Sequence, residues 1–400
     1  MDKKKKIIVD MGLNIVASAI PVFVLQLLVL PSLAGQMTDD KYGLLVTILS
    51  LLNMIPASLG NVLNNIRLIF NKDQTEVEKK NDYNAELLLM VLFNIVIVLV
   101  FSIYYAKTIN VFDLILTVIV SILWLAREYY IVAFRLQINY IYITISNLIM
   151  IPGYAAGYAL FLITNSWQYI YILGYVFSIS FIFIKSDLWK EPFAITPKFK
   201  KITTQSALLF IANFFTRLTT YADKMLIYPI LGGATVSIYY VATLFGKVVS
   251  MAITPVSSVL LSYLSKENSK NDRAFGIAFS CSSIVCVIGY IICVLISRPL
   301  LGLIYPQFVD EAMKYIFITT GTVVVTALIS MINPFVLKFF DMKWQVAINA
   351  LYALMYVSIS LGLLHFWGLY GFCAGTLISA IVKMIFMLIV YLKGKERINE

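Results

Sequence analysis

Six basic side chains lie inside otherwise apolar stretches, and they are the residues of this sequence best suited to chemistry. An ionised side chain in the middle of a hydrocarbon layer costs about 2.5–3.5 kcal/mol on insertion scales, so such residues usually serve a purpose. The acids clearly embedded in the same stretches are two, Glu128 and Asp223. The excess of cations predicts an anionic partner, such as a phosphate-bearing headgroup. The six are Arg67, Arg127, Arg217, Lys224, Lys247 and Lys383.

The segment 213–224 holds the densest polar pattern. Arg217 and Lys224 are seven residues apart, which places them within about 20° of each other on a helix. Asn213 and Thr220 extend this stripe, and a stripe of this kind is expected to face a protein interior rather than lipid. We therefore predict a site for an anionic partner in the protein interior. Its candidate residues are Arg217, Lys224, Lys247, Lys383 and Arg127.

Structural roles compete with binding for several of these residues. Arg67 and Lys383 could extend their charged groups to a membrane surface. Arg127 and Glu128 are adjacent and therefore point to different faces, so each is expected to have its own partner on another helix. Asp223 could neutralise Arg217 or Lys224 in a structural network.

Signs of catalysis or of a cofactor are absent from the sequence. It has no nucleotide-binding loop, zinc-protease helix or nucleophile elbow, so the protein is not expected to be an enzyme. Its four cysteines form no CxxC pair and have no partner histidines, which speaks against a metal site or a disulfide framework. The single histidine, His365, lies beside Trp367 and is interpreted as a membrane-interface residue.

The elements that must position these residues are membrane helices. The chain is 60% hydrophobic and 13% charged, with a mean hydropathy of +0.88. Apolar stretches of about 20 residues, the length that crosses a bilayer, recur along its whole length. The sequence thus predicts an all-α polytopic membrane protein of about twelve transmembrane helices. The spans are 7–33, 42–66, 84–106, 111–134, 141–163, 167–185, 203–230, 235–262, 275–297, 312–337, 344–364 and 368–392.

The net charge of +10 is a topology signal rather than a sign of nucleic-acid binding. With twelve spans, 21 of the loop and terminal Lys and Arg residues fall on one side and four on the other. Such a bias marks the cytoplasmic side, which places both termini there. The four on the outer side are Lys41, Lys107, Arg298 and Lys314.

The first half of the chain is echoed by the second about 200 residues later. Pro31 returns as Pro229, Pro56 as Pro255, and Trp167 with Gly174 as Trp367 with Gly375. Because each half holds six spans, the two copies should be parallel repeats. We predict two six-helix lobes, 1–195 and 196–400, joined by a basic loop around 186–202. The match of Pro56 to Pro255 predicts a bend common to both lobes.

Residues 221–242 carry a resemblance to a known family. Tyr221-Ala222-Asp223-Lys224-Met225-Leu226-Ile227, then Leu231-Gly232, then Val236-Ser237-Ile238-Tyr239-Tyr240-Val241-Ala242 resembles helices seven and eight of Wzx-type polysaccharide-repeat flippases. These belong to the multidrug/oligosaccharidyl-lipid/polysaccharide (MOP) exporter superfamily, which also contains the MATE transporters. Ser237 stands where that family usually has glycine. The length, topology and six-plus-six repeat extend the resemblance over essentially the whole chain.

The resemblance implies transport of an undecaprenyl-pyrophosphate-linked oligosaccharide across the bacterial cytoplasmic (inner) membrane, for O-antigen or capsule synthesis. Members of this family are thought to open alternately to each side around a cationic cavity. It also implies the lipid bilayer as surroundings, and a polysaccharide polymerase and a chain-length regulator as partners. No cofactor is implied. Coupling to a proton or sodium gradient is compatible with it, and the candidate groups are Asp223 and Glu128.

Two other functions remain open from the sequence. A multidrug exporter of the same superfamily would share the fold, but it would favour acidic cavity groups. A membrane-embedded polysaccharide polymerase or glycosyltransferase would have similar spans, but it normally needs a large outward loop. The sequence has no such loop, and its longest outward connection is at about 298–311.

Overall fold

The computed structural model describes residues 19–70, 82–106, 110–193, 195–196, 199–264 and 270–394, and these are almost entirely helical. Each of the twelve predicted spans falls on helix wherever it is described. Eight segments of the described chain are long and apolar enough to cross a membrane. Two of them, Phe199–Gly246 and Lys343–Lys393, each cover two predicted spans. The protein is an all-α, multi-pass membrane protein, as its sequence predicts.

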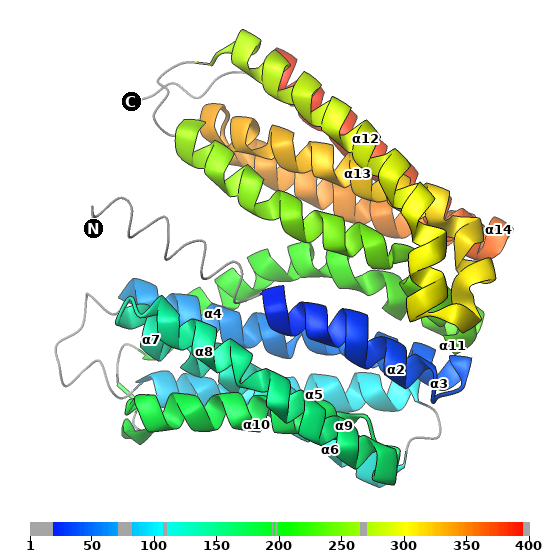
Figure 1. Ribbon diagram of the computed structural model, residues 1–400. Helices are drawn as coiled ribbons and strands as arrows, with labels where there is room; N and C mark the ends of the chain where they lie inside the picture. Colours follow the sequence, from blue (N-terminus) through cyan, green and yellow to red (C-terminus); the bar gives the residue numbers. More distant parts are fainter. Residues whose placement is uncertain are drawn as a thin grey trace. The chain divides into compact units, whose positions relative to one another are not determined.

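The chain divides into two compact units, which we treat separately. Unit 1 contains the described residues up to Met37 and those of Thr47–Met225. Its elements (Figure 1) are the π-helix η1 (Leu25–Val29), α2 (Leu30–Ala34), the second half of α3 (Asp39–Met54), α4 (Pro56–Phe70), α5 (Asp82–Tyr105), α6 (Val111–Tyr130), α7 (Val132–Leu136), α8 (Tyr140–Leu148), α9 (Met150–Thr164), α10 (Gln168–Lys185), the 3-10 turn η3 (Leu188–Lys190) and the first arm of α11 (Phe199–Leu264) up to Met225.

Glycines allow α9 and α10 to pack closely in unit 1. Gly153 and Gly157 lie against the α10 backbone, and Gly174 lies against the ring of Tyr154. A Cβ at any of the three would overlap its neighbour. Small residues at a four-residue spacing are a common basis of helix association in membranes.

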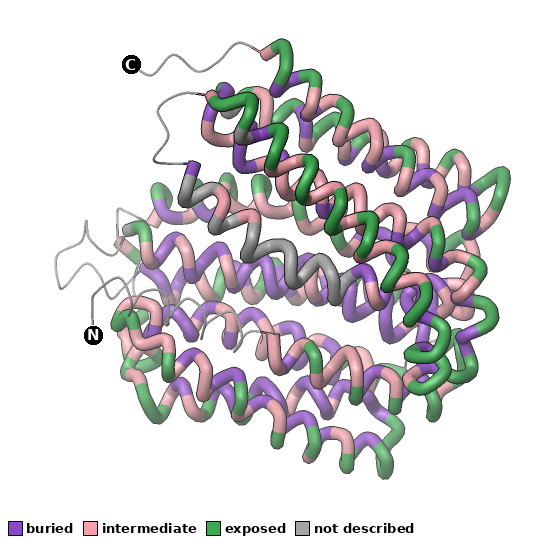
Figure 2. The backbone as a smooth tube through the Cα atoms, turned by 45° about the horizontal axis from the view of Figure 1, so that its top comes forward, coloured by how far each residue is buried: buried purple, intermediate pink, exposed green. Residues whose placement is uncertain are grey.

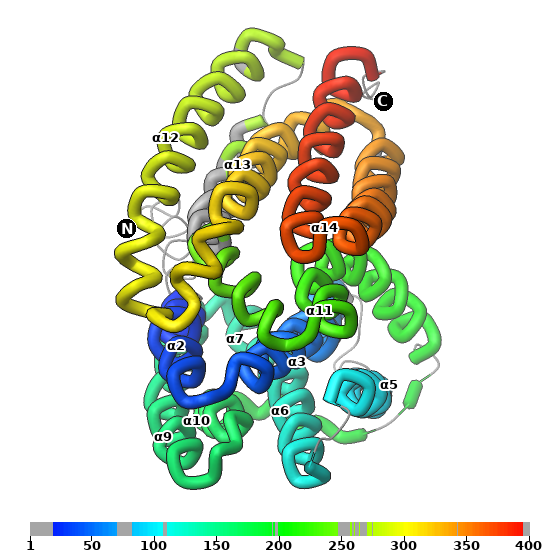
Figure 3. The backbone as a smooth tube through the Cα atoms, turned by 90° about the vertical axis from the view of Figure 1, so that its right-hand side faces the viewer, coloured from blue at the N-terminus to red at the C-terminus, as the bar shows by residue number. Residues whose placement is uncertain are grey.

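Unit 2 contains Thr38–Val46 and the described residues from Leu226 onward. It consists of the second arm of α11, α12 (Asp272–Ile304), the 3-10 turn η4 (Pro306–Phe308), α13 (Val309–Phe339) and α14 (Met342–Lys393). Helix α13 packs against both α12 and α14 (Figure 3). Within α14, Gly375 lies against the backbone of Ser360, so the two arms of this helix cross closely. Gly174 and Gly375, which match in the repeat, thus occupy close helix crossings in their respective units.

Backbone breaks separate the two arms of each long helix. In α11 the break is Gly232, at φ 81° and ψ 174°, a conformation open essentially to glycine. In α14 it is Trp367 with Gly368, the latter at φ 58°. Pro56 begins α4 directly after a break at Ile55, whereas α11 passes through Pro255 with helical backbone angles. The bend predicted to be common to Pro56 and Pro255 stays a prediction.

The beginning of α3 packs against the beginning of the second arm of α11, and both lie in unit 2. Gly43 and Gly233 approach so closely that a Cβ on either would overlap the opposite backbone. The Asp40 carboxylate accepts a hydrogen bond from the Ala234 N–H (2.9 Å), which caps the arm that starts after Gly232. Ser237 Oγ donates to the Asp39 carbonyl (2.6 Å). Glycine and short polar side chains thus join two segments that are almost 200 residues apart.

The compact units do not coincide with the predicted lobes 1–195 and 196–400. The first arm of α11, up to Met225, groups with unit 1 because it packs along α5. Residues 38–46 group with unit 2 because of the Gly43–Gly233 packing. The two-lobe repeat itself stays a prediction.

Buried and exposed residues alternate along the helices (Figure 2). Many of the exposed residues have large apolar side chains. Helix α12 exposes Ile284, Val285, Leu295 and Leu303. In a soluble protein so large an apolar surface would be a liability, whereas a bilayer covers it.

Candidate functional site

The polar stripe of α11 lies on its first arm, in unit 1, and its two cations differ in their surroundings. The Lys224 ammonium is 2.6 Å from Asp223 Oδ1, and both side chains are buried. Lys224 is therefore neutralised inside the protein by its neighbour. The Arg217 guanidinium is half-buried, 5.9 Å from the ring centroid of Tyr221, and has no acidic partner among the described residues.

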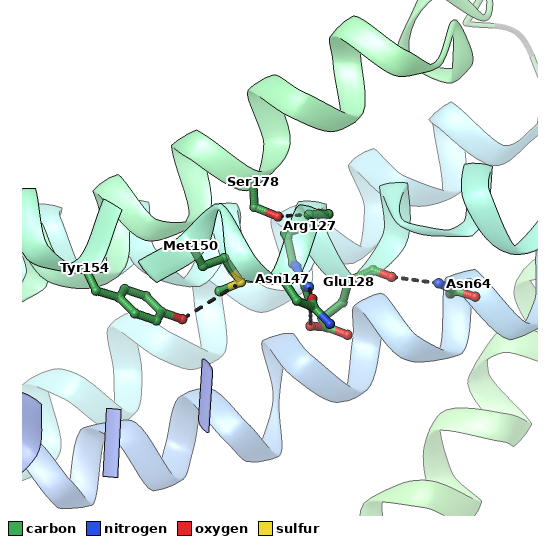
Figure 4. Close-up of polar contacts among 8 residues, drawn as sticks. Asn64, Arg127, Glu128, Asn147, Met150, Tyr154 and Ser178 are labelled. Carbon is green, nitrogen blue, oxygen red and sulfur yellow. Dashed lines mark hydrogen bonds and ion pairs between the residues drawn. The ribbon is translucent and has the colours of Figure 1, made fainter. Parts of the chain in front are cut away.

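Arg127 and Glu128 pair with each other, which corrects the expectation of separate partners. Their side chains form an ion pair of 2.7 Å on α6. Arg127 also donates to the side-chain oxygen of Asn147 on α8, and Asn64 on α4 donates to the Glu128 carbonyl (2.9 Å). Figure 4 shows these groups converging between the helices of unit 1. Adjacent helical residues point about 100° apart, but an arginine side chain is long enough to bend back across that angle.

A second polar contact reinforces the same region. Ser146 and Ser178 join α8 to α10 through their hydroxyls (2.7 Å), and Tyr154 donates to the Met150 sulfur on α9. The Arg127–Glu128 pair is thus one part of a buried polar network that connects α4, α6 and α8. Such a network fixes helix positions, so this arginine is a poor candidate for direct contact with a substrate.

Arg67 is buried among protein side chains rather than extended from the protein surface, as the interpretation of a surface-reaching residue would require. Its side chain donates to Tyr129 Oη (2.8 Å) and to Glu191 Oε1 (2.6 Å), and it lies over the ring of Tyr83. Its relative exposure is 3%. Glu191 belongs to the segment that follows α10, 124 residues away in sequence, and nothing in the spacing of the sequence signalled this pair. The contact fastens that segment to α4.

Lys383 remains without an acidic partner in unit 2. It lies on the second arm of α14, half-buried, and its ammonium is 4.4 Å from the ring centroid of Tyr352 on the first arm. No described carboxylate forms an ion pair with it. Lys247 lies on the helical second arm of α11, and its side chain is outside the described residues.

Of the predicted cations whose side chains are described, Arg127 and Lys224 pair with acids, whereas Arg217 and Lys383 have no acidic partner in the described part of the chain. The two acids proposed for ion coupling, Asp223 and Glu128, are the partners in those pairs. Within the described ranges no three His, Cys, Asp or Glu residues gather as a metal site would require. Arg217 and Lys383 offer positive charge that can attract an anion.

No family model matches the chain, and no curated protein matches it in sequence. Solved structures do match. The chain is similar to the lipid II flippase MurJ in an inward closed conformation, with a TM-score of 0.70, 14% identity, and coverage of 96% of this chain and 86% of that chain.

Multidrug transporters match over a similar length. One is an inward-facing MATE transporter of the MOP superfamily, with a TM-score of 0.65, 12% identity, and coverage of 95% of this chain and 98% of that chain. Another is a MATE transporter in a bent conformation, with a TM-score of 0.59, 13% identity, and coverage of 98% and 96%. The chain shares the fold of these structures. The fold class predicted from the sequence is confirmed, and at these identities the likeness extends to the fold alone.

Proposed function

We propose that the protein moves an undecaprenyl-pyrophosphate-linked oligosaccharide across the bacterial cytoplasmic membrane by alternating access, for O-antigen or capsule synthesis. The fold supports transport, because it is shared with a lipid flippase and with multidrug exporters. The resemblance of residues 221–242 to Wzx-type flippases supports the substrate class. A polysaccharide polymerase and a chain-length regulator would act on or beside the same pathway.

The observation that carries the proposal is the environment of the Lys383 ammonium group. An ammonium that is half-buried in an apolar helix and rests on an aromatic ring has lost part of its hydration. With no carboxylate beside it, the group is available to a pyrophosphate or an acidic sugar. Arg217 offers the same property in unit 1. Arg127 and Lys224 hold their partners already and serve the scaffold.

A multidrug exporter is the second candidate, favoured by the similarity to MATE structures. Exporters of this kind that act on cationic drugs need negative charge at the binding site. The two acids that the sequence places inside the spans, Asp223 and Glu128, are instead both neutralised by lysine or arginine. An anionic substrate therefore fits the charges better.

Deletion of the gene tests the function directly. We expect a lipid-linked repeat unit to accumulate facing the cytoplasm, whereas single unpolymerised units at the cell surface would indicate a polymerase. Complementation with Lys383→Ala should lower surface polysaccharide strongly, and Lys383→Arg should restore part of it. The matched control is Lys343→Ala, an exposed lysine on the same helix. Full complementation by Lys383→Ala at normal protein level would remove this residue from the binding site.

A further inference from the structure

Glu86 on α5 is a fully buried carboxyl group for which the proposed function has no use so far. Its relative exposure is 0%. Thr203 Oγ1, on the first arm of α11, donates to Glu86 Oε2 (2.6 Å). Glu86 Oε1 and the nearby α11 hydroxyl of Ser206 are buried and have no hydrogen-bond partner among the described residues.

No described cation balances this carboxyl group. On its own helix, Asp82 accepts hydrogen bonds from Thr196. Three helices packed around α5 carry ionisable groups. Helix α4 has Arg67, which pairs with Glu191, and α6 has Asp113 and the Arg127–Glu128 pair. The first arm of α11 has Lys200, Lys201, Arg217, Asp223 and Lys224. None of these forms an ion pair with Glu86. A buried carboxylate with no counter-charge is costly, so an added proton is the simplest way to neutralise it.

The location of Glu86 gives that proton a role. Helix α5 and the first arm of α11 run side by side in the same direction and touch at three levels. Glu86 meets Thr203 at one end, the rings of Phe93 and Phe210 meet in the middle (6.1 Å between centroids), and Tyr105 Oη donates to the Met225 carbonyl (3.0 Å) at the other end. The same arm of α11 carries Arg217. A shift of this arm against α5 would expose Glu86 to water and move the cationic stripe at the same time.

We propose that Glu86 is the group that takes up and releases a proton during the transport cycle. In the packed arrangement the carboxyl group is protonated. When the α11 arm moves away from α5, water reaches Oε1, the O–H bond breaks and the proton passes to water. The residues first considered for this task are less suitable, because Asp223 and Glu128 keep a cation beside them. The link to transport rests on the proposed function, whereas the protonation of Glu86 does not.

Infrared spectroscopy of the purified protein in lipid nanodiscs tests the protonation by itself. A buried carboxylic acid gives a C=O stretching band that is distinct from carboxylate bands. We expect this band in the wild type, its loss in Glu86→Gln, and its retention in Glu128→Gln, which removes an ion-paired acid. Thr203→Val should shift the band, because it deletes the hydrogen bond to Oε2. A spectrum of Glu86→Gln that matches the wild type would overturn the proposal, and Thr203→Val still reports on the site if Glu86→Gln folds poorly.

Transport in proteoliposomes tests the coupling, with a fluorescent polyprenyl-pyrophosphate disaccharide as the probe. A pH gradient should accelerate transfer by the wild type, and Glu86→Gln should lose this response to the gradient. A sodium gradient should have no effect on either protein. Sodium-driven transfer, or a pH response retained in Glu86→Gln, would contradict the assignment. Failure of the wild type to move the probe at all would count against the proposed function and leave the infrared result standing.

Discussion

At the scale of single residues, two ion pairs show that side chains adjacent in sequence can neutralise each other on a helix. In both Arg127–Glu128 and Asp223–Lys224 the partners are neighbours in sequence. A helical projection places such neighbours on different faces, and it ignores the length and bend of the side chains. Because the Asp223–Lys224 pair is buried, its attraction offsets a desolvation cost rather than adding a large surplus of stability.

This balance gives a prediction for Lys224. Lys224→Ala would leave the Asp223 carboxylate buried without its partner and should destabilise the protein by about 3–5 kcal/mol. The double variant Asp223→Asn/Lys224→Met should be more stable than Lys224→Ala, because no charge remains unbalanced. Thermal unfolding in detergent measures both, with Lys200→Ala as a control at an exposed lysine. A double variant no better than the single one would show that Asp223 has another cation as its main partner.

At the scale of elements, glycine acts in two physically different ways. Gly43 and Gly233 permit a close approach of α3 to the second arm of α11, where no Cβ has room. Gly232, one residue earlier, has nothing within 4 Å of an added Cβ but requires a positive φ. The first role is steric and the second is conformational.

Alanine substitutions separate the two roles. Gly232→Ala should cost about 1–3 kcal/mol, the range for a side chain forced into a disfavoured backbone region. Gly43→Ala should be worse and should lower the amount of folded protein, because both sides of the contact are backbone and neither can move aside. Gly289→Ala, on α12 with open space around it, is the matched control and should be neutral or slightly stabilising. Fluorescence size-exclusion profiles and melting temperatures rank the three, and a Gly43→Ala protein as stable as the control would contradict the close packing.

At the scale of the whole molecule, the sequence was enough to predict where the helices are, but not which residues of different helices contact each other. Long apolar runs predict spans because only a satisfied helical backbone is stable in lipid. The backbone breaks agree with the predicted spans, because Gly232 and Trp367 fall between adjacent spans. The Arg67–Glu191 contact joins residues 124 positions apart, and the burial of Glu86 depends on α11 lying along α5. Such contacts are set by how helices pack. The pattern of residues within one helix does not identify the residues of the helix that packs against it. The site could therefore be predicted as a set of cations, but not sorted into paired and available ones.

The orientation of the molecule in the membrane gives the last prediction, because the positive-inside bias assigns a side to each end of each helix. His365, exposed beside Trp367, should face outward, and Lys190, in the segment after α10, should face the cytoplasm. In a variant whose four cysteines are replaced by alanine, a membrane-impermeant thiol reagent should label His365→Cys in intact cells and Lys190→Cys only after permeabilisation. The same assignment places Glu86, at the beginning of α5, towards the cytoplasm, and the Gly43–Gly233 contact towards the outside. Labelling in the opposite order would reverse these positions, and protons released from Glu86 would then leave towards the outer side.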